Sequence, residues 1–234
     1  MTGQPYGKRF YDNLAQLSRD SARIFLGHLF SFWKPASVID VGCGDGAWLG
    51  ACTLNGPARL VGLDGNWVTH DMMPSAAIEF RPTDLRQDFS AGSFDLAISM
   101  EVAEHLPPEA SDRFFHSLAR CADAVLFSAA FSGQPGTDHI NTRLHSFWAA
   151  KFLGQGYQLF DLFRPKFWSD ERVAPWYRQN TFLYAKPGHP LHRALEAAGL
   201  RGSTDAGFVD CIHPWLYFYL LEQLREAAEA ARPA

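Results

Sequence analysis

The sequence predicts an α/β protein in which a parallel sheet is covered by helices on both faces. The first observation is a β-branched apolar run at residues 38–41, which indicates a buried strand and leads into glycines at alternate positions before a helical apolar pattern resumes. The second is that further strand-like runs alternate with gaps of helix length, as is typical of parallel sheets. The third is a closing pair of runs that fits an antiparallel hairpin at one edge of the sheet.

The expected strands follow this rhythm along the chain. They are Ser37–Val41, Arg59–Asp64, Ala77–Phe80, Phe94–Ser99, Ala124–Ser128, Tyr157–Phe163 and Thr181–Ala185. Apolar residues at helical spacing predict helices over residues 10–33, Ser146–Leu153 and Trp215–Ala231. Pro35 ends the first of these regions, because proline cannot continue a helix.

These elements divide the chain into three segments. Residues 1–35 are expected to form an N-terminal helical lid, and residues 36–187 the main domain. Residues 188–234 are expected to form a helical extension that packs on the same domain. The aromatic-rich segment Trp215–Tyr219 makes a homodimer possible.

Composition narrows the class of protein. The 234 residues are 47% hydrophobic and 14% aromatic, which is ample material for one large core. The net charge of −4 argues against a polyanion as main partner, because neutralising phosphates needs a basic surface. Nucleic acid is therefore not the expected substrate.

The cysteines and the apolar runs indicate a cytoplasmic protein. The four cysteines (Cys43, Cys52, Cys121 and Cys211) are scattered and lack the CxxC spacing of zinc sites, so we expect buried thiols in a reducing compartment. No apolar stretch approaches the ~20 residues that a membrane-spanning helix needs.

The glycine loop is the main functional signal. Gly42, Gly44 and Gly46 can adopt positive φ and let the backbone lie directly against a ligand. A strand, a glycine turn and a helix N-terminus together form a nucleotide cradle. A dinucleotide fingerprint would place its third glycine at position 47, where Ala47 is tolerated, so the loop alone leaves a nicotinamide cofactor open.

Acidic residues at strand ends add to this signal. Asp40 lies in the first strand, two residues before the first glycine. Asp64 ends the second strand about 20 residues after the loop, where an acid accepts hydrogen bonds from ribose hydroxyls. Asp84 follows the third strand, where it would reach an adenine amino group, and Glu101 follows the fourth.

Four segments in this order resemble the successive motifs of class I S-adenosylmethionine-dependent methyltransferases. They are Val38–Ala47, Gly62–Gly65, Thr83–Leu85 and Phe94–Leu106, and the resemblance runs from about residue 20 to 186. It implies a Rossmann-like, seven-stranded, mostly parallel sheet in the order 3-2-1-4-5-7-6. Later segments at 136–141, 147–148, 167–168 and 176–180 resemble a bacterial subgroup from small-molecule or saccharide pathways.

The resemblance implies a cofactor site for S-adenosyl-L-methionine. Its residues are Asp40, Gly42, Gly44 and Gly46 around the methionine part, Asp64 on the ribose, Gly65, Asn66 and Trp67 beside the adenosine, Asp84 and Leu85 at the adenine, and Met100 and Glu101 at the sulfonium end.

The candidate catalytic residues are Glu104, His105 and His139. A hydroxyl acceptor must lose its proton to a base or to a metal that acidifies it. In one helical turn Glu101, Glu104 and His105 would share a face, and with His139 they could bind Mg²⁺, Mn²⁺ or Zn²⁺. The Glu-x-x-Glu-His pattern is similar to that of ubiquinone-pathway and small-RNA 2′-O-methyltransferases, where it holds a divalent cation. The alternative is a metal-free site in which His105 acts as a cap or as the base.

The leading hypothesis is methyl transfer to a small-molecule or saccharide acceptor, at oxygen. N-methylation of a small amine is the alternative within the class. A nicotinamide-dependent oxidoreductase is the first rival, but the chain lacks a Tyr-x-x-x-Lys pair and a second dinucleotide half. A non-catalytic cofactor-binding subunit is the second.

Overall fold

The computed structural model describes residues 8–54, 56–57 and 59–230, with side chains from residue 15 onward. Its sheet has seven strands in the order β3-β2-β1-β4-β5-β7-β6, which confirms the predicted topology. The strands are β1 Ser37–Val41, β2 Arg59–Asp64, β3 Ile78–Pro82, β4 Leu96–Met100, β5 Ala124–Ser128, β6 Gln158–Phe160 and β7 Phe182–Ala185. Strands β1 to β5 are parallel, and β7 pairs antiparallel with both β5 and β6.

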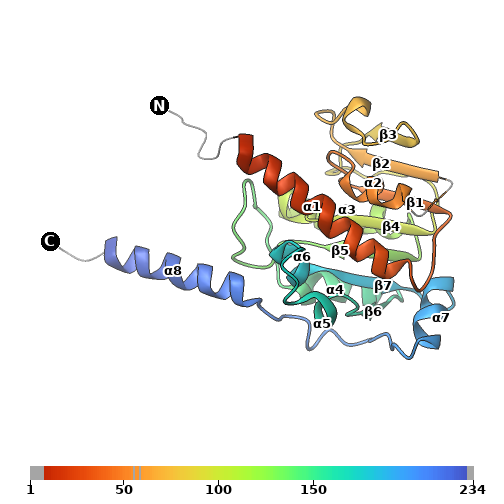
Figure 1. The fold of residues 1–234 in the computed structure, drawn as a ribbon. Coiled ribbons are helices and arrows are strands. Elements are labelled where there is room, and N and C mark those ends of the chain that lie inside the picture. The colour runs from red at the N-terminus through yellow and green to blue at the C-terminus, as the bar shows by residue number, and fades with distance from the viewer. Residues whose placement is uncertain (1–7, 55, 58, 231–234) are drawn as a thin grey trace.

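Helices cover both faces of this sheet (Figure 1). They are α1 Lys8–Leu29, α2 Ala47–Thr53, α3 Ser111–Ala119, α4 His145–Gly154, α5 Arg164–Phe167, α6 Pro175–Asn180, α7 Pro190–Ala197 and α8 Pro214–Ala230, with short 3-10 turns η1 His70–Met72, η2 Ala103–His105 and η3 Pro108–Ala110. Among the described residues, no helix combines the length and apolar character needed to cross a bilayer.

Successive side chains of each strand point to opposite faces of the sheet, so the protein has one core on each face. In β1, Val38 faces one core and Ile39 the other, and both side chains are fully buried. The core on the α1 side includes Phe25, Leu49, Phe167 and Leu191. The core on the α3 side includes Phe114, Leu118, Trp148 and Phe152. A sheet buried on both faces explains why the parallel strands have near-continuous apolar sequences.

Strands β3, β4, β6 and β7 differ from their predicted ranges at one or both ends. Strand β4 begins at Leu96 instead of Phe94, because the Asp95 carboxylate accepts hydrogen bonds from the backbone N–H groups of Ala36 and Ser37 at 2.8 and 2.9 Å. Strand β6 ends at Phe160, and the chain that follows turns into α5, whose second residue is a proline.

The described part of the N-terminal segment, residues 8–35, contains one long helix. Helix α1 packs on α2, and its C-terminal half buries Phe25 and Leu29 in the core. Residues 1–7 of the expected lid lie outside the described residues.

Helices α7 and α8, in the expected C-terminal extension, differ in how far they are buried. The α7 part does pack, with Leu191 fully buried. In α8 only Leu216 is buried, and the helix extends away from the body of the protein (Figure 1). Phe218, for example, is 64% exposed. Helical periodicity in the sequence indicates an apolar stripe, but it does not show whether another surface covers that stripe.

Candidate functional site

The glycine loop crosses the carboxyl ends of β1 and β2. Gly42 has φ +86°, and a Cβ there would lie 2.3 Å from the Val102 side chain, so no other residue fits. Gly44 has φ +51° and open space around its Cα, and its N–H donates to Asp64 Oδ2 at 2.8 Å. The loop therefore presents bare backbone beside an acidic side chain, as a nucleotide cradle requires.

Asp64 lies at the centre of this edge. Its second oxygen, Oδ1, accepts from the Gly65 N–H at 2.7 Å, so two backbone amides fix the carboxylate. The side chain is almost completely buried. Each oxygen has accepting capacity left over, which suits hydrogen bonds from a pair of vicinal hydroxyls.

Asp40 is a buried carboxyl that lacks a counter-charge. It is 1% exposed, and its Oδ2 has no hydrogen-bond partner among the described residues. Burial, and after it the charges of Asp64 and Asp45, raise the pKa of Asp40 well above its usual range. A cationic group beside Asp40 would remove this penalty, and the ammonium of a bound methionine moiety fits that requirement.

The residues expected around adenosine are spread along the β2 and β3 ends. The Trp67 ring lies over Gly65, where a Cβ would come within 2.1 Å of it, and the side chain is 75% exposed. Asn66 is exposed as well. Leu85 is buried, whereas Asp84 is exposed and paired with Arg86 at 2.8 Å.

Glu101 is held by a polar clamp at the end of β4. Its backbone is left-handed, with φ +56°, and its N–H donates to Ser128 O and Oγ at 3.1 and 3.0 Å. Its carboxylate accepts from Gln134 Nε2 at 2.9 Å and from Asn180 Nδ2 at 3.0 and 3.2 Å. Met100 before it is buried at the strand end.

Gln134 and Asn180 were not among the predicted site residues. Asn180 directly precedes Thr181 and β7, and because β7 is antiparallel to β5 it starts at the edge where the parallel strands end. That position is the signal from which Asn180 could have been found. Gln134 lies in the loop after β5, and its sequence offers no comparable signal.

Glu104, His105 and His139 come together beside this clamp. One ligand atom from each lies within 4.8 Å of the others, and the two imidazole rings are 4.9 Å apart at their centroids. Each Nδ1 faces a backbone carbonyl: His105 that of Asp138 at 3.3 Å and His139 that of Gln134 at 3.2 Å. Since a carbonyl only accepts, both Nδ1 atoms donate, and in a neutral ring the lone pair is then on Nε2.

Burial shifts the pKa values of Glu104 and His139 in opposite directions. Glu104 is completely buried and neither carboxyl oxygen has a partner among the described residues; burial, and then the charge of Glu101, raise its pKa well above the usual range. Burial lowers the pKa of His139, so its imidazole is neutral at physiological pH. A neutral imidazole can accept a proton or bind a metal.

The expected helical turn over residues 101–105 is wrong in one respect. Glu101 is left-handed, and the helical part is only the 3-10 turn η2. Pro107 and Pro108 follow at once, which keeps the turn short. Glu101 therefore does not belong to the group of three that gathers around Glu104, and its carboxylate is engaged by Gln134 and Asn180 instead.

Asn141 holds η2 in place. Its backbone N–H donates to Glu104 O at 2.9 Å, and its Nδ2 donates to Ala103 O at 3.2 Å and Ser111 Oγ at 2.9 Å. The loop after β5 and the turn after β4 are thereby joined, which positions His139 against His105.

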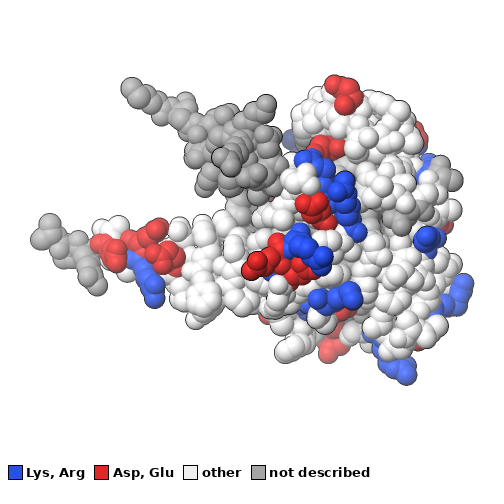
Figure 2. All heavy atoms as spheres, viewed as in Figure 1, with Lys and Arg blue, Asp and Glu red and all other residues white. Residues whose placement is uncertain are grey.

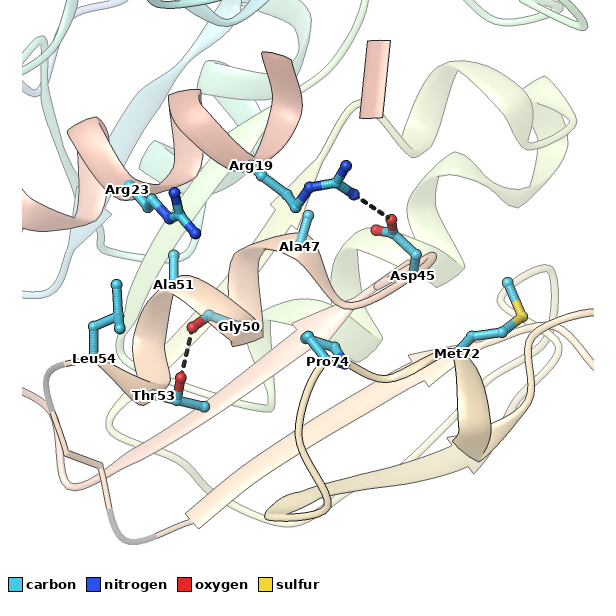
Figure 3. A pocket seen from close by; sticks show the side chains of 10 residues that line it. All are labelled: Arg19, Arg23, Asp45, Ala47, Gly50, Ala51, Thr53, Leu54, Met72 and Pro74. Atoms are coloured by element: carbon cyan, nitrogen blue, oxygen red, sulfur yellow. Dashed lines mark hydrogen bonds and ion pairs between the residues drawn. The ribbon is translucent and has the colours of Figure 1, made fainter. Parts of the chain in front are cut away.

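A separate pocket of about 340 Å³ lies between α1 and α2 (Figure 3). Arg19 of α1 reaches across it to Asp45 of the glycine loop, at 3.4 Å. Both side chains are more than a third exposed, so this ion pair contributes little stability. It ties the N-terminal helix to the cofactor loop.

The sheet order and the loop that leads from β1 into α2, with Asp64 opposite it, together define the class I S-adenosylmethionine-dependent methyltransferases. Residues 15–204 match the family model described as a methyltransferase domain. The chain belongs to this family and is an S-adenosylmethionine-dependent methyltransferase. This assignment decides against the nicotinamide-dependent oxidoreductase that the glycine loop alone left open.

Three known proteins are similar to this chain. Magnesium protoporphyrin IX methyltransferase from Synechocystis PCC 6803, solved with S-adenosylhomocysteine, has a TM-score of 0.56 and 18% identity, covering 80% of this chain and 90% of that one. CalS10, an amino pentose methyltransferase from Micromonospora echinaspora solved with S-adenosylmethionine, has a TM-score of 0.56 and 14% identity, covering 80% and 100%. A probable chloroplastic tocopherol O-methyltransferase of Oryza sativa subsp. japonica is 36% identical over 98 residues, which are 38% of this chain and only 26% of that relative.

Asp40→Asn is expected to stabilise the ligand-free protein and weaken cofactor binding. A carboxyl whose folded pKa is raised loses its stabilising contribution as the pH rises from its unfolded value, about 3.9, through the folded pKa. The gain in Tm from asparagine should therefore be larger at pH 8 than at pH 4. S-adenosylmethionine affinity should fall by ~1–3 kcal/mol, because the ammonium loses a charged partner. Thermal melts at both pH values and calorimetry check this; lower stability at pH 8 with unchanged affinity would contradict it.

Proposed function

We propose that this methyltransferase transfers a methyl group to a hydroxyl oxygen of a small-molecule or saccharide acceptor. The observation that carries the proposal is the group formed by Glu104, His105 and His139 beside the cofactor loop. Two imidazoles with free Nε2 atoms provide proton acceptors that an amine acceptor, which needs only to be neutral, would not require.

The site has two further tasks, which are to remove the proton of the acceptor hydroxyl and to position its oxygen. Bound S-adenosylmethionine supplies an activated methyl group. The Nε2 atom of His139 or His105 accepts the hydroxyl proton of the acceptor, and the carbonyls on both Nδ1 atoms keep the rings oriented for this. Holding the acceptor oxygen on the axis of the methyl group lowers the barrier further.

The same three residues fit a divalent cation. One carboxylate and two imidazoles are a ligand set suited to Zn²⁺ or Mn²⁺, and with added water to Mg²⁺. Such an ion would occupy the Nε2 atoms, so it would replace the histidine base and would itself acidify the acceptor hydroxyl. The two buried oxygens of Glu104, which have no hydrogen-bond partner in the described part of the chain, support this proposal, because an ion would compensate their burial.

The distribution of charged side chains on the surface also favours a small acceptor. Figure 2 shows Lys and Arg side chains interspersed with Asp and Glu over the face in view, with no continuous basic patch there. Together with the net charge of −4, this favours a small molecule over nucleic acid.

Metal-stripped protein tests both parts of the proposal. Methyl-labelled S-adenosylmethionine is supplied with acceptor pairs that carry a hydroxyl or an amine on the same scaffold, before and after chelation. We expect label on oxygen, a fall of more than about tenfold on chelation, and recovery with Mg²⁺, Mn²⁺ or Zn²⁺. Label on nitrogen alone would overturn the oxygen acceptor. Full activity after verified metal removal would overturn the ion and leave the histidine base.

A further inference from the structure

A second pocket, of about 360 Å³, lies beside the loop that carries His139. Its volume falls in the range of small-molecule sites, about 300–1,000 Å³. It is lined by Ser132, Thr142, Arg143, Leu144, Ser146 and Phe147. Three hydroxyls, one guanidinium and one aromatic ring are therefore gathered around a single hollow.

Arg143 is the charged group of this pocket. Its Nε donates to Asn141 Oδ1 at 2.8 Å, and its guanidinium lies 5.0 Å from the Phe147 ring centroid. Among the described residues it takes part in no ion pair. The side chain is half-buried and fixed on two sides, so a fork of N–H donors is held ready for an acceptor group.

The neighbouring lysine and the N-terminus of α4 already have partners. Lys151 also lies over the Phe147 ring, at 4.6 Å, but it is paired with Asp112. The second amide of α4, Ser146 N, donates to Asp210 Oδ1 at 2.9 Å, so the helix N-terminus already has an acceptor. Arg143 is thus the group in this pocket with positive charge to offer.

The pocket is connected to the catalytic group by two hydrogen bonds. Asn141, which accepts from Arg143, also donates its backbone N–H to Glu104 O at 2.9 Å. A molecule that reaches Arg143 therefore lies along the same loop as His139 and next to the turn that carries Glu104 and His105.

From these observations we propose that the Arg143 pocket binds an anionic group, a carboxylate or a phosphate, on a hydroxylated methyl acceptor. The inference rests on the proposed function and specifies its substrate class. The guanidinium receives the anion, the hydroxyls of Ser132 and Thr142 bond neighbouring hydroxyl groups, and the Phe147 ring packs on the carbon skeleton. The acceptor hydroxyl to be methylated then lies toward His105 and His139.

The test measures binding of three probes by ligand-observed NMR in the presence of S-adenosylhomocysteine. They are D-glucuronate, D-glucose 6-phosphate and D-glucose, which separate a carboxylate, a phosphate and a neutral sugar. We expect at least one anionic probe to bind more tightly than glucose, and its Kd to rise about tenfold in Arg143→Gln. Arg143→Lys, which keeps the charge but loses the fork, should lie between them.

Arg23→Gln is the matched control, because it removes one arginine charge from the pocket between α1 and α2. It should leave all three affinities unchanged. The inference is overturned if neither anion binds the wild-type protein better than glucose, or if Arg143→Gln binds both anions as the wild type does. The NMR titration measures binding and not methyl transfer, so its result is independent of the labelling experiment. Anion binding at Arg143 together with label only on nitrogen would overturn the oxygen acceptor and leave the anion site. Unchanged affinity of both anions in Arg143→Gln, together with label on oxygen in the chelation experiment, would overturn the pocket alone.

Discussion

Replacing His139 with alanine lowers kcat by ~10²-fold or more, and His105→Ala does the same if the two imidazoles act together. The reason is the proposed role of the two Nε2 atoms as proton acceptors, with both Nδ1 atoms held by carbonyls. Cofactor affinity should remain within about twofold of the wild type, because neither ring belongs to the glycine loop or to Asp64. Single-turnover methyl transfer and calorimetry with S-adenosylhomocysteine measure the two quantities separately.

The matched control is His116→Ala, which removes an exposed imidazole on α3. It should turn over like the wild type. The double variant, His105→Ala with His139→Ala, should be little worse than either single variant if the pair works as a unit. Wild-type turnover in both single variants would show that the catalytic group has been misassigned.

The acid side of the pH–rate profile follows from the same group. Burial lowers the pKa of His139, so its neutral, proton-accepting form persists to lower pH than that of a free imidazole. The midpoint of the decline in kcat on the acid side should therefore lie below the value of about 6.5 of a free imidazole, which a pH–rate profile measures.

Asp64→Ala is expected to weaken S-adenosylmethionine binding by ~1–3 kcal/mol. The carboxylate is fixed by the N–H groups of Gly44 and Gly65, so it meets a ribose with little loss of entropy. Removing it takes away charge-assisted hydrogen bonds and also frees the Gly44 amide. Calorimetric titration gives the affinity, and a thermal melt of the ligand-free protein reports any loosening of the loop.

Asp64→Asn separates the two effects, because it keeps the shape of the side chain and one acceptor oxygen. It keeps one of the two backbone hydrogen bonds, so it should restore part of the Tm and part of the affinity. Asp88→Ala, at an exposed aspartate of a later loop, should change neither. If Asp64→Ala bound the cofactor as tightly as the wild type, Asp64 would not hold the ribose.

The parts of the fold that local chemistry determines were predictable from the sequence. The run through Val38 and Ile39 indicated a strand buried on both faces, and the structure places those two side chains in opposite cores. The glycine loop was predictable for a related reason, since Gly42 stands where any side chain would collide with Val102.

The clamp on Glu101 was not predictable in the same way. It joins the ends of β4 and α6 with the loop after β5, so its partners are 33 and 79 residues away along the chain. The pattern Glu-x-x-Glu-His suggested one helical face, but the left-handed backbone at Glu101 and the prolines after Leu106 prevent a regular turn. Tertiary contacts, not local periodicity, decided which acidic side chain joins the two histidines.

The exposed apolar stripe of α8 illustrates a different limit. Helical spacing correctly predicted the helix, because its apolar residues recur every three or four positions. The burial of that stripe depends on what lies opposite it, and the sequence of α8 contains no information about that. A homodimer through Trp215–Tyr219 stays a proposal, which sedimentation of the intact protein would test.

Calorimetric titration of the purified wild-type protein with S-adenosylmethionine, S-adenosylhomocysteine and NADH tests the central claim most directly. The account predicts micromolar binding of the first two, no heat with NADH, and a loss of affinity in Asp64→Ala and Asp40→Asn but not in His139→Ala. Binding of NADH in their place, or equal affinity in all three variants, would contradict the cofactor site described here.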